Sequence, residues 1–207
     1  RNIENIENKI INKNNDISKI VDIGGGYCQF GEMIKRKVSN VKITTVDFYE
    51  QLILGYFYLL ENFPKEKICP MSKIMSTEKI DTNFINSYDF VLIPAEYFKK
   101  IENCDFDLLT NFSSFGEMPN AVFKRYLNSK IFDKIRFFYT VNRLDSWPDY
   151  KNGISVIDYL LKRFQPIHLE ISPIWTNYYV SYTSIIEPIK KAFKSRNFEF
   201  IGKNENR

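Results

Sequence analysis

The chain has 207 residues, 44% of them hydrophobic and 26% charged, which fits one sizeable α/β domain and leaves little room for a second. Its 29 basic and 25 acidic residues give a net charge of +4, which is too small to indicate a nucleic-acid partner. No apolar run reaches the roughly 20 residues of a membrane span, and three widely spaced cysteines fit reduced thiols in a cytoplasm better than disulfides or a zinc site.

Apolar strands alternate with amphipathic helices through most of the sequence. Strands are expected at residues 20–23, 41–46, 88–93, 106–111, 135–141, 167–171 and 178–184. Helices are expected at residues 30–38, 50–62, 118–127 and 154–164. This order predicts an α/β fold with a doubly wound, mostly parallel seven-stranded sheet and an antiparallel edge strand.

The two ends of the chain are less regular. Residues 1–18 carry isoleucines at a helical spacing, which predicts a short N-terminal helix or tail ahead of a single domain over residues 19–207. Residues 63–87 show no firm period. The basic residues near the C-terminus are interpreted as a solvated helix face; they are Lys190, Lys191, Lys194, Arg196, Lys203 and Arg207.

A glycine-rich motif follows the first strand, in the run Val21-Asp22-Ile23-Gly24-Gly25-Gly26-Tyr27. Gly24 and Gly26 match the first two positions of the dinucleotide fingerprint G-x-G-x-x-G, but the third position is Gln29. Together with Asp22 they also match the acid-x-G-x-G-x-G loop typical of S-adenosylmethionine binding, with Cys28 in place of the last glycine. A tight strand-to-helix turn without any ligand is the third interpretation.

Two acidic residues favour one of these interpretations. Ligands of open parallel sheets bind outside the carboxyl ends of the strands, where Asp47 ends the second strand and can accept both hydroxyls of a ribose. Asp22 precedes the first glycine by two residues, where a carboxylate can accept the amino group of a methionine moiety. The motif therefore indicates S-adenosylmethionine more strongly than a nicotinamide dinucleotide.

The chain resembles class I S-adenosylmethionine-dependent methyltransferases, and more narrowly the sugar O-methyltransferases of bacterial surface-polysaccharide gene clusters. Three segments carry the resemblance: the glycine motif, Thr45-Val46-Asp47-Phe48-Tyr49-Glu50, and residues 106–118. The last segment is the most specific, because it is similar to the family's Asp-hydrophobic-Asn run followed by Ser-Phe-x-Glu-Met. The resemblance covers residues 19–142 and implies the Rossmann-like methyltransferase fold, while Cys28 departs from the general glycine pattern.

The resemblance also implies which residues bind S-adenosylmethionine. Asp22 and the glycines would surround the methionine portion, Asp47 would bind the ribose, and Phe48 would pack on the adenine. The residues after the third strand would line the adenine pocket, and those ending the fourth strand would lie beside the sulfonium. The full set is Asp22, Gly24, Gly25, Gly26, Tyr27, Asp47, Phe48, Pro94, Ala95, Glu96, Asn111 and Phe112.

Methyl transfer to a hydroxyl requires an aligned acceptor and removal of its proton. Glu117, which follows the fourth strand, is the first candidate base, with capping of the next helix as the alternative role. His168 is the only histidine and the second candidate, with a structural role in an apolar strand as the alternative. The candidate acceptor-binding residues are Ser114, Asp145 and Trp147, although the last two could equally shape a loop.

The sequence thus predicts a cytoplasmic enzyme that methylates a hydroxyl of a nucleotide-linked or glycan-precursor sugar. The alternatives are an NAD(P)-dependent oxidoreductase, which Gln29 opposes, and a degenerate, non-catalytic cofactor-binding domain. A lipid, peptide or small metabolite is a weaker choice of acceptor. One histidine and scattered acids indicate no metal site, with a divalent ion held by carboxylates alone as the alternative. The oligomeric state stays open, a homodimer included.

Overall fold

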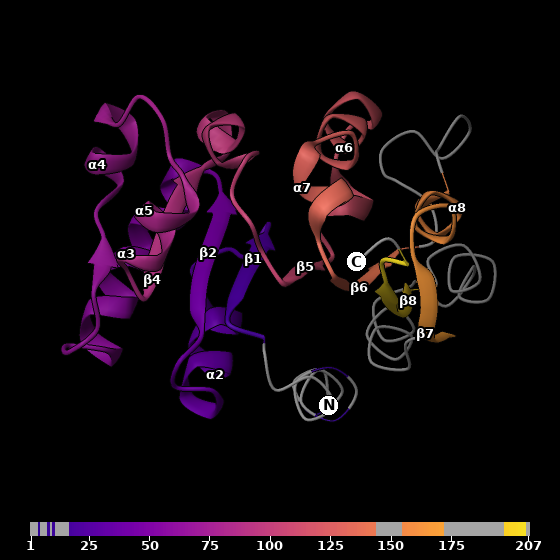
Figure 1. Cartoon of the computed structure of the whole chain (residues 1–207), viewed down its shortest axis with the longest axis horizontal. Helices are drawn as coiled ribbons and strands as arrows, with labels where there is room; N and C mark the ends of the chain where they lie inside the picture. The colour runs from indigo at the N-terminus through magenta and orange to yellow at the C-terminus, as the bar shows by residue number, and fades with distance from the viewer. Residues whose placement is uncertain are drawn as a thin grey trace, which may run out of the picture. The chain divides into compact units, whose positions relative to one another are not determined.

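The computed structural model describes residues 17–143, 155–171 and 197–205, together with the single residues Glu4, Asn8 and Ile10. The chain divides into two compact units. The first unit comprises Arg1–Thr110, Asn128–Phe137 and Arg207, and the second comprises Asn111–Leu127 and Phe138–Asn206. Figure 1 labels their helices and strands.

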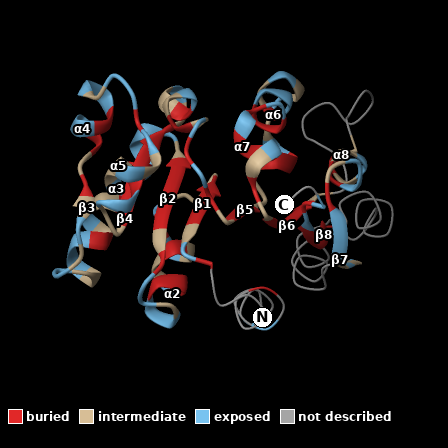
Figure 2. Cartoon of the chain, viewed as in Figure 1, coloured by how far each residue is buried: buried red, intermediate tan, exposed pale blue. Residues whose placement is uncertain are grey.

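Parallel strands in the order β3-β4-β2-β1-β5 form the sheet of the first unit. Their bounds are β1 (Lys19–Ile23), β2 (Lys42–Asp47), β3 (Ile68–Cys69), β4 (Phe90–Pro94) and β5 (Leu108–Phe112), of which β5 continues into the second unit. All of β4 is buried, as are the last four residues of β1, and Figure 2 shows this burial along the sheet. Strands covered on both faces are expected to be continuous apolar runs, which is how these segments appear in the sequence.

Helices connect these strands. Their bounds are α2 (Gln29–Lys37), α3 (Tyr49–Asn62), α4 (Met71–Ser76), α5 (Thr82–Asn86), the 3₁₀ helix η2 (Ala95–Ile101) and α7 (Lys130–Lys134). α3 buries Leu52, Gly55 and Leu59, which lie three and four residues apart on one helical face. Asp81 caps α5, because its carboxylate accepts a hydrogen bond from the N–H of Phe84.

Asp89 joins several elements where β4 begins. Its carboxylate accepts hydrogen bonds from the ammonium groups of Lys35 (3.0 Å) and Lys42 (2.9 Å) and from the N–H of Lys67 (2.9 Å). Burial would raise the pKa of Asp89, but the Lys67 N–H and the two ammonium groups outweigh it and hold that pKa well below its usual value. These contacts fix α2, β2 and β4 to one another.

The second unit combines the end of β5 with strands in the order β5-β6-β8-β7. Its elements are η3 (Phe115–Glu117), α6 (Asn120–Leu127), β6 (Phe137–Arg143, from Phe138 onward), α8 (Val156–Leu161), β7 (Gln165–Ile171) and β8 (Asn197–Lys203). The buried Phe115 packs against Phe123, Tyr126 and Phe138 at centroid distances of 5.5, 6.3 and 6.3 Å. A good part of the chain's aromatic content therefore forms a hydrophobic core.

The α/β class, the parallel set of strands and an antiparallel pair at one edge are confirmed. The described residues form eight strands rather than seven: six of the expected strands and two that were not expected. The unexpected strands are β3, which has only two residues in the segment without a readable period, and β8, which is the antiparallel partner of β7. Among the basic residues expected on a solvated helix face, only Lys203 is described; it is exposed, but it ends the strand β8 and does not lie on a helix. The strand expected at 178–184 and most of the helix expected at 1–18 lie outside the described residues.

No helix in the described part of the chain is long and apolar enough to cross a membrane. Cys28, Cys69 and Cys104 are free and buried, as their spacing predicts.

Candidate functional site

The chain turns sharply between β1 and α2. Gly24 and Gly26 have φ angles of 73° and 56°, in the left-handed region that glycine adopts without strain. The N–H of Gly24 donates to the carbonyl oxygen of Val46 (2.7 Å), which ties the turn to the neighbouring strand β2. Cys28 also has a positive φ of 71° and immediately precedes α2. The backbone at Cys28 therefore retains the conformation that the motif's last glycine would favour.

Two further glycines allow the elements around this turn to approach closely. A Cβ at Gly25 would lie 2.4 Å from Oδ2 of Asp22 and 2.7 Å from a methyl group of Thr45. A Cβ at Gly55 on α3 would lie 2.8 Å from Sγ of Cys28. Real Cβ atoms do not approach other atoms this closely. The turn is therefore in direct contact with β1 and β2 at Gly25, and with α3 at Gly55.

Asp47 lies at the carboxyl end of β2, beside the glycine turn. Its Oδ2 accepts a hydrogen bond from the N–H of Gly26 (2.7 Å), and its Oδ1 accepts one from the N–H of Phe48 (2.6 Å). Each carboxylate oxygen can accept a second hydrogen bond, so the group is held in place and can still bind a pair of hydroxyls. The next side chain, Phe48, is 71% exposed and presents a free aromatic ring.

Asp22 is buried under the same turn. Its Oδ1 accepts a hydrogen bond from the hydroxyl of Thr110 (2.7 Å), whereas its Oδ2 has no hydrogen-bond partner among the described residues. Burial raises the pKa of Asp22 to about 7, the Thr110 hydrogen bond lowers it in part, and the nearby Asp47 carboxylate raises it further. Neither Asp22 nor Asp47 has a basic side chain among its hydrogen-bond partners in the described part of the chain.

The residues expected to line the adenine pocket follow β4. Asp47 and Pro94 are direct partners in the parallel pairing of β2 with β4. Pro94 is buried, Ala95 is half-buried and Glu96 is exposed. The first unit therefore brings together the predicted residues at the carboxyl ends of three neighbouring strands, β1, β2 and β4.

In the second unit, Asn111 is the centre of a buried hydrogen-bond network. Its side-chain oxygen accepts from the N–H of Phe115 (3.1 Å) and from the side-chain amide of Asn142 (2.7 Å). Its own amide donates to the hydroxyl of Ser114 (2.6 Å), and Asn142 accepts from the N–H of Gly116 (2.9 Å). Asn111 is fully buried and fixes the segment that precedes α6.

The remaining predicted residues differ in their placement. Phe112 is half-buried and packs edge-on against Tyr139, with a centroid distance of 5.3 Å. The exposed Glu117 lies 3.6 Å from the guanidinium of Arg143. His168 is on β7, with Nε2 facing the carboxylates of Glu170 and Glu199. Asp145 and Trp147 lie outside the described residues.

Sequence reasoning missed two residues that position the predicted ones. Thr110 donates to Asp22 across the pairing of β1 with β5, and Asn142 on β6 donates to Asn111 on β5. Both contacts depend on the register between strands that are far apart in the sequence. The only available signal was a polar residue near the end of an otherwise apolar strand.

No protein-family model and no curated protein matches the sequence. Solved structures do match. One is geranyl diphosphate C-methyltransferase from Streptomyces coelicolor, in complex with Mg²⁺, geranyl diphosphate and S-adenosyl-L-homocysteine, at 13% identity over 90% of this chain and 71% of that chain, with a TM-score of 0.53. A geranyl diphosphate methyltransferase in complex with SAM matches at 12% identity over 90% of this chain and 78% of that chain, with a TM-score of 0.55.

A third match is the S-adenosylmethionine-dependent methyltransferase SibL, at 10% identity over 98% of this chain and 55% of that chain, with a TM-score of 0.53. Identities this low carry information about the fold and none about the acceptor. The chain therefore has the fold of class I SAM-dependent methyltransferases.

Proposed function

We propose that this chain binds S-adenosylmethionine and transfers its methyl group to a hydroxyl group of a sugar. The observation that carries the proposal is the Asp47 carboxylate, held by the N–H groups of Gly26 and Phe48 beside a left-handed glycine turn. The similarity in fold to methyltransferases that bind SAM or S-adenosyl-L-homocysteine supports it.

The residues of the first unit fit this cofactor. Asp47 retains acceptor capacity for the two ribose hydroxyls, and the exposed ring of Phe48 suits adenine. The glycine turn has no side chain to obstruct the methionine portion. Asp22 offers a buried oxygen without a hydrogen-bond partner in the described residues, for which an ammonium group is a suitable partner.

Charge at the turn favours this cofactor over a nicotinamide dinucleotide. Asp22 and Asp47 interact as neighbouring acids, and neither has a basic hydrogen-bond partner among the described residues. A cationic ligand relieves their repulsion, whereas a pyrophosphate adds two negative charges. The site is therefore better suited to a ligand that carries a sulfonium and an ammonium group.

When bound, S-adenosylmethionine supplies a methyl group that is already activated for in-line displacement. The protein then has to orient the acceptor hydroxyl and remove its proton. We assign the proton to a carboxylate oxygen of Glu117, which is exposed and is the last residue of η3, the short helix after β5. The sugar acceptor itself rests on the resemblance of residues 106–118 to sugar O-methyltransferases.

Ligand-dependent stability tests the cofactor assignment. At a hundredfold excess over its Kd, S-adenosylmethionine should stabilise the parent chain by about 2.7 kcal/mol, and a tenfold weaker site would retain only about 1.4 kcal/mol. Asp47→Asn should weaken binding at least to that degree, while Glu61→Gln, an exposed acid on α3, should leave binding unchanged. Stabilisation by NAD⁺ but not by S-adenosylmethionine would refute the proposal.

Turnover tests the acceptor. The chain should methylate members of a nucleotide-sugar panel when supplied with isotopically labelled S-adenosylmethionine, and the product should gain the mass of one CH₂ group. Glu117→Gln should retain cofactor binding and lose turnover. Transfer to lipid, peptide or metabolite acceptors alone would show that the acceptor class is wrong while leaving the cofactor assignment intact.

A further inference from the structure

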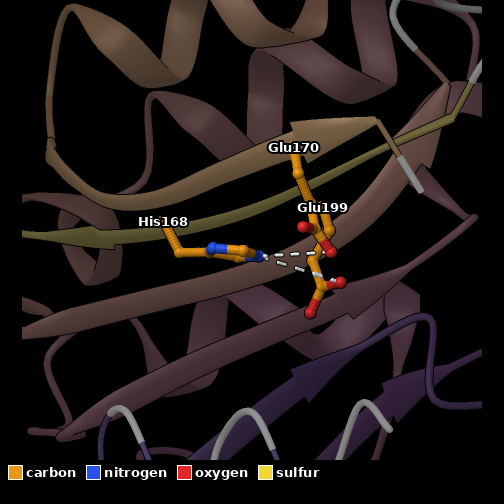
Figure 3. Close-up of side chains that lie close together, drawn as sticks. All are labelled: His168, Glu170 and Glu199. Atoms are coloured by element: carbon orange, nitrogen blue, oxygen red, sulfur yellow. Dashed lines mark ion pairs between the residues drawn. The ribbon is translucent and has the colours of Figure 1, made fainter.

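Three metal-ligating side chains lie close together on β7 and β8 in the second unit. The two strands are antiparallel, and Glu170 is paired directly with Glu199. His168 lies two residues before Glu170 on the same face of β7. Figure 3 shows the imidazole pointing toward both carboxylates. Nε2 of His168 is 3.6 Å from Oε1 of Glu170 and 4.0 Å from Oε2 of Glu199.

Two carboxylates lie opposite each other at this site. Like charges directly opposite each other in an antiparallel pair destabilise the pairing, and Glu199 is only 1% exposed. The buried hydroxyl of Tyr139 donates a hydrogen bond to its Oε1 (2.7 Å). Burial of a carboxylate is costly unless a cation or several hydrogen bonds compensate it.

The burial of the two faces of β7 supports the same inference. Ile167, Leu169 and Ile171 are between 42% and 48% exposed, while His168 and Glu170 are the better-buried residues of the strand. A register shift between Pro166 and His168 accompanies this orientation. Hydrophobic patterning alone would have buried the opposite face, so the strand instead turns His168 and Glu170 toward Glu199.

The distances favour a bound cation over a hydrogen-bonded imidazolium. Hydrogen bonds between nitrogen and oxygen are about 2.7–3.2 Å long, and Nε2 of His168 is buried without a hydrogen-bond partner among the described residues. Ligand atoms placed about 2.1 Å from a tetrahedral metal ion lie about 3.4 Å from one another. The ligand atoms of the three side chains all lie within 4.8 Å of one another, so small side-chain rotations would bring them to that spacing.

We propose that His168, Glu170 and Glu199 bind a divalent transition-metal ion of the zinc class, with the fourth coordination position open. One imidazole nitrogen and two carboxylate oxygens are ligands that Zn²⁺ accepts. The ion would join β7 to β8 and neutralise the paired glutamates. This inference does not depend on the proposed methyl transfer.

Calorimetric titration of the tag-free, chelator-treated chain with Zn²⁺ tests the site. One ion should bind per folded chain and raise the Tm. Two variants, Glu170→Gln and His168→Gln, should each weaken Zn²⁺ binding by about 100-fold. Removing a residue that only contacts a metal ligand already weakens binding by about 10- to 100-fold, so loss of a ligand should reach at least the upper value. Glu170 is partly exposed, so the chain should tolerate its replacement. The matched control is Glu205→Gln, an exposed acid just after β8, which should bind as the parent does.

Co²⁺ provides a second measurement, because the three free cysteines are alternative zinc ligands. Binding at the proposed site should give ligand-field bands without thiolate-to-metal charge transfer. The proposal is overturned if the folded chain binds no Zn²⁺, if Co²⁺ binding shows thiolate charge transfer, or if both variants bind as tightly as the parent.

Discussion

Replacing Asp22 with asparagine should change how stability depends on pH. Burial raises the pKa of Asp22 from 3.8 to about 7, so the folded state binds its proton more tightly than the unfolded state does. The favourable contribution of the protonated group is complete below the unfolded pKa and is lost as the pH rises through the folded pKa. The asparagine side chain has no proton to lose, so its contribution should stay constant over the same range.

The size of the effect follows from the two pKa values. The difference between 3.8 and about 7 corresponds to about 4 kcal/mol at about 1.36 kcal/mol for each pKa unit. Asp22 is 1% exposed, so solvent screening does not reduce this figure substantially. Relative to the parent chain, Asp22→Asn should therefore gain about 4 kcal/mol between acid and mildly alkaline pH.

Urea denaturation at a series of pH values from about 3 to about 8 measures this difference. The free energy of unfolding is determined for both chains at each pH, and the difference between them is plotted against pH. Glu78→Gln, which removes an exposed carboxyl, is the control for loss of one acidic group. A difference that stays constant across the range would show that Asp22 is ionised in the folded state without penalty, and would refute the account of its burial.

Two further predictions concern the packing of the first unit. Gly55→Ala should destabilise the chain by about 1–3 kcal/mol in urea denaturation, although alanine has the better helix propensity. The reason is that the new Cβ would lie 2.8 Å from Sγ of Cys28 and 3.2 Å from the backbone of Tyr27. Gln51→Ala, one turn earlier on the exposed side of α3, should be neutral or slightly stabilising, and equal effects would contradict the packing argument. A thiol reagent should react with three cysteines in denaturant and with almost none in the native chain. The reason is that burial raises the pKa of Cys28 to about 12, of Cys69 to about 11 and of Cys104 to about 12. Rapid reaction of any one of them in the native chain would disprove its burial.

The glycine turn could be predicted from the sequence because its chemistry is local. Gly24 and Gly26 need only their own φ angles, and Asp47 contacts the residue that follows it and a turn fixed by the adjacent strand. The parallel order of strands brings these positions to one edge of the sheet once alternating strands and helices are recognised. Contacts such as Thr110 with Asp22 depend on strand register, which apolar composition does not specify.

Asn111 is a motif position whose hydrogen-bond partners could not be predicted from the sequence. Its place beside the sulfonium, which the resemblance implies, stays a prediction, while its side-chain amide is hydrogen-bonded to Ser114, Phe115 and Asn142 within the second unit. A buried amide with these partners fixes the backbone that leads into η3. In this structure the motif residue positions its neighbours, a role that the order of residue types alone does not reveal.

The polar face of β7 lay beyond sequence reasoning for a different physical reason. Alternation along Ile167, His168 and Leu169 favours burial of the aliphatic side chains, whereas the sequence left His168 with either a catalytic or a structural role. The register shift after Pro166 instead places His168 and Glu170 on the side of Glu199, a residue 29 positions later in the chain than Glu170. Neither the shift nor the partner is encoded within the strand itself. A cluster of potential metal ligands can therefore arise from residues that, taken separately, are typical of an exposed strand face.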